Sequence, residues 1–106
     1  MTDNLFRNIP DRADQEFVES LVTRPGARVE RIVSRGHRSP EGFWYDQDDD
    51  EWVVLVRGRA TLSFADGRTL EMQAGDHAWI PAHAKHRVDW TAPDVETVWV
   101  AVFIGR

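Results

Sequence analysis

Polar and apolar residues alternate in several short segments of the chain after residue 26. Residues 60–64 and 86–90 both follow a period of two along the sequence. This period is typical of β-strands that bury one face. Glycine, proline and aspartate residues separate the segments at short intervals, and Asp66-Gly67 is a strong hairpin signal. The pattern therefore predicts an all-β sandwich or barrel.

Two further segments, residues 52–56 and 98–104, are apolar at nearly every position. Strands of this kind are covered on both faces, by the barrel interior on one side and by a second sheet, a helix or another subunit on the other. A chain of 106 residues buries only a modest core by itself. These two observations together lead us to expect a homodimer.

The first 26 residues have a different pattern. Residues 14–23 carry acids at their start and apolar side chains at roughly helical spacing, namely Phe17, Leu21 and Val22. Pro25-Gly26 follows this segment and is a typical helix stop. We therefore predict an N-terminal arm and short helix over residues 1–26 and a β-barrel domain over residues 27–106.

Charge and composition exclude several classes of protein. The net charge is −5 and the isoelectric point is about 5.2, which argues against nucleic acid as a partner. No apolar run approaches the ~20 residues of a membrane span, and the polar N-terminus lacks the pattern of a signal peptide. Cysteine is absent, which suits a reducing compartment. We therefore expect a cytoplasmic protein without a membrane or nucleic-acid partner.

Two spaced motifs point to one family. The second has the glycine, proline and histidine spacing of the second cupin motif, at Gly75, Pro81 and His86. The first consists of Glu51 and Gly58, which have the spacing of the glutamate and the glycine at the end of the first cupin motif. Most of the chain after residue 26 therefore resembles a small single-domain bacterial cupin. This resemblance implies a cupin-like jelly-roll barrel, often dimeric, that holds a divalent metal ion inside.

The chain departs from the family's pattern at the start of the first motif, where the family has His-x-His. With three residues between this pair and Glu51, the two positions hold Tyr45 and Gln47. With four, they would hold Trp44 and Asp46. We prefer the first register because residues of equal parity on a strand share a face.

Gln47, Glu51 and His86 are the candidate metal ligands. His86 begins an alternating strand and Glu51 shares a face with Val53, so both are expected to point inward. A buried carboxylate needs a cation, a metal or a donor, and an ion pair with an arginine is the structural alternative for Glu51. A carboxylate, an amide and an imidazole suit Mn, Fe or Ni better than a closed zinc site. The predicted cofactor is a divalent first-row metal ion.

Tyr45 and His83 are the candidate catalytic residues. The Tyr45 phenol could donate a hydrogen bond to a ligand, and His83, which replaces the usual glycine of the second motif, could shuttle a proton at the barrel mouth. Core packing for Tyr45 and a surface turn for His83 are the alternatives. Asp46 and residues 48–50 lack the spacing of a calcium loop and are expected to be solvated.

These residues predict a small metal-binding cupin that acts on a small organic molecule. The metal would be a Lewis acid or an oxygen-activating centre, and the fold does not select among oxygenation, isomerisation and decarboxylation. The missing His-x-His leaves a second prediction open, a non-enzymatic barrel that binds or senses a small molecule without metal. A third is a barrel that serves only as an interaction module.

Overall fold

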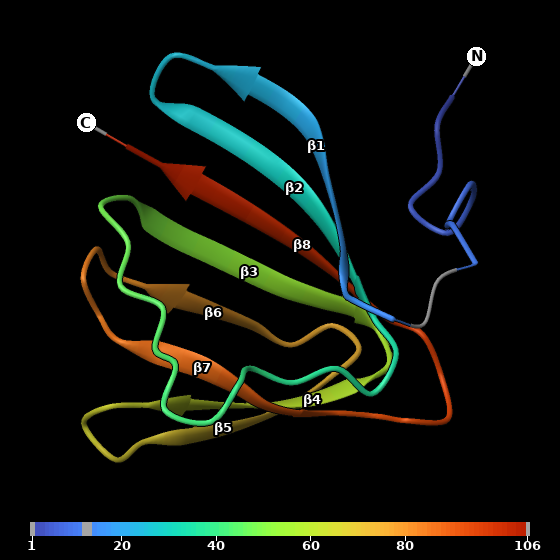
Figure 1. Ribbon diagram of the computed structural model, residues 1–106. Helices are drawn as coiled ribbons and strands as arrows, with labels where there is room; N and C mark the ends of the chain where they lie inside the picture. Colours follow the sequence, from blue (N-terminus) through green and yellow to red (C-terminus); the bar gives the residue numbers. More distant parts are fainter. Residues whose placement is uncertain (1, 12–13, 106) are drawn as a thin grey trace.

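The computed structural model describes residues 2–11 and 14–105, and its elements are eight β-strands (Figure 1). The strands are β1 (Phe17–Arg24), β2 (Ala27–Ser34), β3 (Asp50–Arg57), β4 (Arg59–Phe64), β5 (Thr69–Gln73), β6 (His77–Ile80), β7 (His86–Thr91) and β8 (Thr97–Ile104). No helix occurs in the described residues, so none of them forms an apolar helix that could cross a membrane. The prediction of an all-β fold is confirmed.

The strands form two antiparallel sheets that face each other (Figure 1). The larger sheet has the order β1-β2-β8-β3-β6, and the smaller has the order β5-β4-β7. Asp66-Gly67 makes the turn between β4 and β5, as its sequence predicts, with the N–H of Phe64 donating to the carbonyl of Arg68. This arrangement confirms the predicted jelly-roll barrel.

The predicted N-terminal helix is wrong, because residues 17–24 form β1 and pair with β2 in the larger sheet. The register of this pair shifts between Ser20 and Val22. A bulge of this kind breaks the period of two along a strand, so the apolar spacing imitates a helical pattern. Pro25-Gly26 is the two-residue turn of the β1–β2 hairpin and not a helix stop.

The core lies between the sheets and is built from alternate residues of the central strands. Val53 and Leu55 of β3 and Trp99, Ala101 and Phe103 of β8 belong to this buried cluster, together with side chains from the smaller sheet. Glu51 has the same parity as Val53 on β3. The alternation that buries the core therefore also turns the Glu51 carboxyl group inward.

The outer face of the larger sheet carries an apolar row that crosses all five strands. Direct pairing places five apolar residues side by side in this row, which are Trp79, Trp52, Val102, Val29 and Val22. The N-terminal arm packs elsewhere on this face, where the Arg31 guanidinium donates to the carbonyls of Leu5 and Arg7 at 3.0 and 2.8 Å. We call these five residues the apolar row.

Gly58 joins β3 to β4 at a position that only glycine fits. Its φ is +94°, and a Cβ atom there would clash with Oγ1 of Thr97 and lie 2.7 Å from its Cα. Both the backbone conformation and the contact exclude a side chain. The glycine that ends the first motif is therefore required by the crossing between the two sheets.

Candidate functional site

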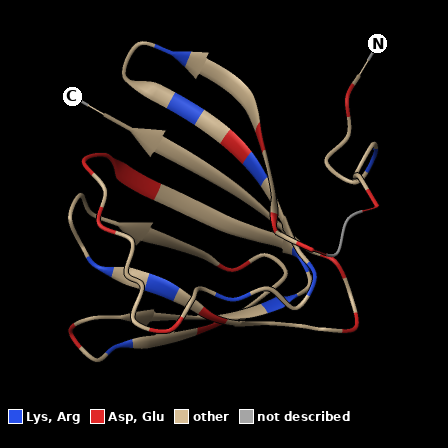
Figure 2. Cartoon of the chain, in the orientation of Figure 1, with Lys and Arg blue, Asp and Glu red and all other residues tan. Residues whose placement is uncertain are grey.

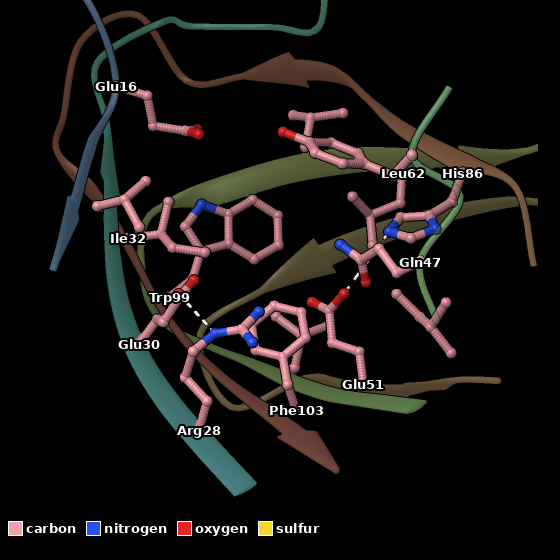
Figure 3. A pocket seen from close by; sticks show the side chains of 15 residues that line it. Glu16, Arg28, Glu30, Ile32, Gln47, Glu51, Leu62, His86, Trp99 and Phe103 are labelled. Atoms are coloured by element: carbon pink, nitrogen blue, oxygen red, sulfur yellow. Dashed lines mark hydrogen bonds and ion pairs between the residues drawn. The ribbon is translucent and has the colours of Figure 1, made fainter. Parts of the chain in front are cut away.

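A cavity of about 200 Å³ opens between the two sheets (Figure 3). Most of its wall is apolar and comes from both sheets, with Val53, Leu62, Ile80, Val88, Trp99 and Phe103 among the lining residues. The polar lining residues are Glu16, Arg28, Glu30, Tyr45, Gln47, Glu51 and His86. An apolar pocket with a few converging polar groups is the usual form of a small-molecule site.

Glu51 places a carboxylate deep in this cavity. The residue is only 6% exposed, because β3 turns it toward the core between Ile80 of β6 and Phe103 of β8. Within the described residues it forms no ion pair with an arginine, and its ionic partner is His86, with Nε2 3.7 Å from Oε1. At this distance the two groups attract each other without a direct hydrogen bond.

His86 is held in a fixed orientation at the start of β7. Its Nδ1 lies 2.8 Å from the carbonyl oxygen of Ala84, and an acceptor at this atom favours the tautomer with the proton on Nδ1. The Nε2 atom then faces Glu51 in the cavity. The Tyr45 ring stacks on the imidazole with a centroid distance of 5.3 Å, and Phe64 lies at 6.0 Å.

The two titratable groups beside Glu51 have shifted pKa values. Burial lowers the pKa of His86, but the interaction with Glu51 and the hydrogen bond to the Ala84 carbonyl outweigh it, so that this pKa is raised. The pKa of the Tyr45 phenol is raised by burial first, and then by the negative charges of Glu16 and Glu51. Tyr45 therefore stays a neutral hydrogen-bond donor near pH 7.

A loop before β3 brings Tyr45 and Gln47 into the cavity. The loop is tied to β7 by two backbone hydrogen bonds between Tyr45 and His86, of 2.7 and 3.2 Å. Both side chains line the cavity, whereas Trp44 is 38% exposed. Figure 3 shows the Gln47 amide beside the Glu51–His86 pair. The structure therefore places the residues of the preferred register, and not Trp44, inside.

His83 lies outside the cavity lining. Its Nδ1 is 2.7 Å from Oδ1 of Asp46 and its Nε2 is 3.4 Å from Oδ1 of Asp48, and its side chain is 62% exposed. Its φ of 64° is left-handed, which explains why the family's motif has glycine at this position. This placement is that of a surface turn, and a catalytic role for His83 stays a prediction.

Four lining residues with polar side-chain atoms were not among the sequence-based candidates: Glu16, Arg28, Glu30 and Trp99. The indole N–H of Trp99 is buried and has no hydrogen-bond partner among the described residues. Arg28 and Glu30 are two residues apart on β2, so the sequence alone indicates that they lie on the same face of this strand. Glu16 precedes β1 outside any regular strand, so no periodicity marks it.

The donor atoms in the cavity fit an open metal site with oxygen and nitrogen ligands. Two atoms that each bind one ion at about 2.1 Å can lie up to about 4.2 Å apart, so Glu51 and His86 can share an ion at their separation of 3.7 Å. Among the described residues, no three His, Cys, Asp or Glu side chains gather into a metal-binding group. A third protein ligand would therefore be the weaker amide oxygen of Gln47.

Comparisons with known proteins agree with this architecture. Residues 31–103 match the family model described as "Cupin domain". A protein of Ralstonia eutropha named "putative mannose-6-phosphate isomerase" is 42% identical, and its crystal structure matches over 100% of this chain and 99% of that chain with a TM-score of 0.93. No curated protein matches the chain.

Two more distant crystal structures share the fold. A cupin superfamily protein from Desulfitobacterium hafniense is 15% identical, with a TM-score of 0.76 over 92% of this chain and 84% of that chain. A protein from Neisseria meningitidis is 20% identical, with a TM-score of 0.70 over 99% of this chain and 100% of that chain. With a barrel of two antiparallel sheets, both spaced motifs and a family match over most of its length, the chain belongs to the cupin family.

Proposed function

We propose that this cupin binds a small organic molecule in its cavity together with a divalent first-row metal ion, with Mn, Fe or Ni favoured over Zn. Glu51 and His86 would hold the ion, and Gln47 would be a weaker ligand. The observation that carries the proposal is the orientation of His86. Its Nδ1 is engaged by a backbone carbonyl, and its Nε2 faces a buried carboxylate that has no arginine partner among the residues that the structure describes.

The chain's own residues suit chemistry on a small polar molecule. A bound metal would supply a Lewis acid or an oxygen-activating centre. The Tyr45 phenol, held neutral by its raised pKa, would donate a hydrogen bond to the ligand, and the apolar wall would exclude water. Isomerisation is the first reaction class to assay, because a relative with 42% identity carries an isomerase name; oxygenation and decarboxylation follow.

Metal analysis of protein purified without an affinity tag tests the proposal. We expect bound Mn, Fe or Ni, or uptake of one of these ions by calorimetry after chelation, in a ratio near one per chain. Glu51→Gln and His86→Gln should abolish uptake, whereas the exposed residues Glu71 and His77 provide matched controls in Glu71→Gln and His77→Gln. Protein that takes up no Mn, Fe, Ni, Co or Zn would refute the metal site.

A second candidate function is small-molecule binding without metal. It is favoured by the absence of a three-ligand group among the described side chains and by the apolar wall of the cavity. The unpartnered N–H of Trp99 also calls for an acceptor, since an unpaired buried donor costs about 1–3 kcal/mol. Ligand-induced thermal stabilisation that persists with a chelator and in Glu51→Ala would favour this function.

We also propose that the protein forms a homodimer through the apolar row on the larger sheet. Trp79 at one end of this row is 52% exposed, and large exposed apolar surfaces are uncommon on monomers. Light scattering at micromolar concentration should give about 24 kDa, twice the 12.2 kDa of one chain. Trp79→Glu should give monomers, and Trp90→Glu, on the other sheet and 39% exposed, should not. A wild-type mass of one chain would refute the dimer.

A further inference from the structure

We propose that the organic ligand of the cavity carries a positively charged nitrogen, so that the site selects amines over alcohols and alcohols over carboxylates or phosphates. This inference rests on the proposed function, since it names the class of molecule that the same cavity binds. It depends on the charges that line the cavity, on which of them already have partners, and on the rings between them.

The lining has an excess of negative charge. It contains three carboxylates, from Glu16, Glu30 and Glu51, against one guanidinium, from Arg28, and one imidazole, from His86, so that the carboxylates outnumber the cationic groups even when His86 is protonated. Figure 2 shows further acidic positions on the loop that leads into β3. A ligand anion would enter a partly apolar space in which its charge is repelled and poorly screened.

Arg28 is not free to receive a ligand anion. Its Nε donates to Oε2 of Glu30 at 2.8 Å, and one of its terminal nitrogens lies 3.6 Å from Oδ2 of Asp49. The guanidinium also lies 4.2 Å from the centroid of the Phe103 ring (Figure 3). Two carboxylates and an aromatic face therefore already surround the arginine of the cavity lining.

Two of the three carboxylates have no arginine or lysine partner within the described chain. Glu51 is 94% buried and faces the cavity, with His86 as its ionic partner at 3.7 Å. Glu16 accepts a hydrogen bond from the Ser34 hydroxyl at 2.7 Å through Oε2 only. A carboxylate that lacks a strong partner in the wall of a partly apolar cavity favours a cation, and this holds for the buried Glu51 and for the partly buried Glu16. Because Glu51 is the proposed ligand of the metal ion, Glu16 is the carboxylate that would bind the charged nitrogen of the organic ligand.

Aromatic rings share the cavity wall with these two carboxylates. Figure 3 shows the Trp99 indole with the Glu16 carboxylate on one side and the Glu51 carboxylate on the other. The Tyr45 ring also lines the cavity. Indole and phenol rings attract organic cations through their π faces. A divalent ion at Glu51 would offset the charge at that end of the cavity only, so the preference for a cation at the Glu16 end remains.

Three probes of nearly equal shape test this inference: benzylamine, benzyl alcohol and benzoate. Calorimetry or ligand-observed NMR at neutral pH, on chelated and on Mn-loaded protein, gives their relative affinities. We expect benzylamine to bind at least about tenfold more tightly than benzoate, with benzyl alcohol between them. Glu16→Gln should weaken benzylamine about tenfold and leave benzyl alcohol unchanged, because a hydrogen bond to a charged group is lost.

Glu71→Gln on the exposed face of β5 is the matched control for the charge of the whole chain. Thermal unfolding of both variants checks that the fold is kept. The inference is overturned if benzoate binds as tightly as benzylamine, if Glu16→Gln leaves the affinity for benzylamine unchanged, or if no probe binds at millimolar concentration. An amine preference without metal uptake would contradict only the metal site, and metal uptake without an amine preference would contradict only the ligand class.

Discussion

Two histidines of one motif, His83 and His86, lie only three residues apart and have very different surroundings. The His86 side chain is 6% exposed, is oriented by a backbone carbonyl and faces one buried carboxylate. The His83 side chain is 62% exposed and lies between two surface carboxylates, those of Asp46 and Asp48. Both have acidic neighbours, so the presence of a histidine beside an acid does not by itself mark a site.

Burial is what separates the two positions. In water, a histidine and a carboxylate at the surface gain little from each other, because solvent and salt screen their charges. Inside the barrel the same pair has lost water on both sides and has few alternative partners. If the cavity binds a metal ion as proposed, the ion would therefore be stabilised more at the buried His86 than at the exposed His83.

Replacement of each histidine in turn should give the largest difference between the two positions, measured as the loss of metal affinity. We expect His86→Gln to reduce affinity for Mn or Ni by more than about 100-fold, because an imidazole ligand in a fixed orientation is lost. His83→Gln should change it by less than about twofold. Calorimetry on chelated protein measures both values, and equal losses in the two variants would show that the comparison is wrong.

Protonation of His86 in metal-free protein sharpens the comparison. Its folded-state pKa is raised above the ordinary value of 6.5 by Glu51 and the Ala84 carbonyl, against the effect of burial. The interaction therefore stabilises the fold below pH 6.5, and this contribution is lost as the pH rises through the folded-state pKa. Glu51→Gln should lower the pKa of His86, which an NMR titration of its ring signals measures; an unchanged pKa would mean that Glu51 is not its partner.

The smallest expected effects concern the backbone at His83. A β-branched side chain is poorly tolerated at its φ of 64°, so His83→Val should lower the free energy of unfolding by about 1–2 kcal/mol. His83→Gly should change it by less than about 1 kcal/mol, since relief of strain and the loss of the Asp46 contact oppose each other. Urea denaturation measures both. If the valine variant is as stable as the wild type, the positive φ at this position does not explain why the motif has glycine there.

Much of the barrel could be predicted from the sequence because its short apolar or alternating segments are separated by turn residues. Residues 60–64 alternate as predicted and form most of β4. In β7 the predicted alternation holds only from His86 to Val88, because the pairing with β4 shifts register between Thr61 and Leu62 and leaves Trp90 exposed. The strand β1 could not be predicted in this way. Its bulge between Ser20 and Val22 shifts the apolar residues out of phase, and its pairing with β2 is a long-range preference that outweighs local propensity.

The candidate site was only partly predictable. Parity on one strand and motif spacing indicated that Glu51 and His86 point inward, and the structure brings them together at 3.7 Å. Glu16 could not be found, because it reaches the cavity from a segment before β1 that has no periodic pattern. Trp99 was visible only as a core residue, since its unpartnered N–H depends on the packing around it.

The central claim is that Glu51 and His86 hold a metal ion between them. Crystals of tag-free protein, grown with Mn and measured at an energy with anomalous signal, test it most directly. We expect one anomalous peak in the cavity within bonding distance of both side chains. A cavity without such a peak, or a peak bound only by the surface carboxylates around His83, would contradict it.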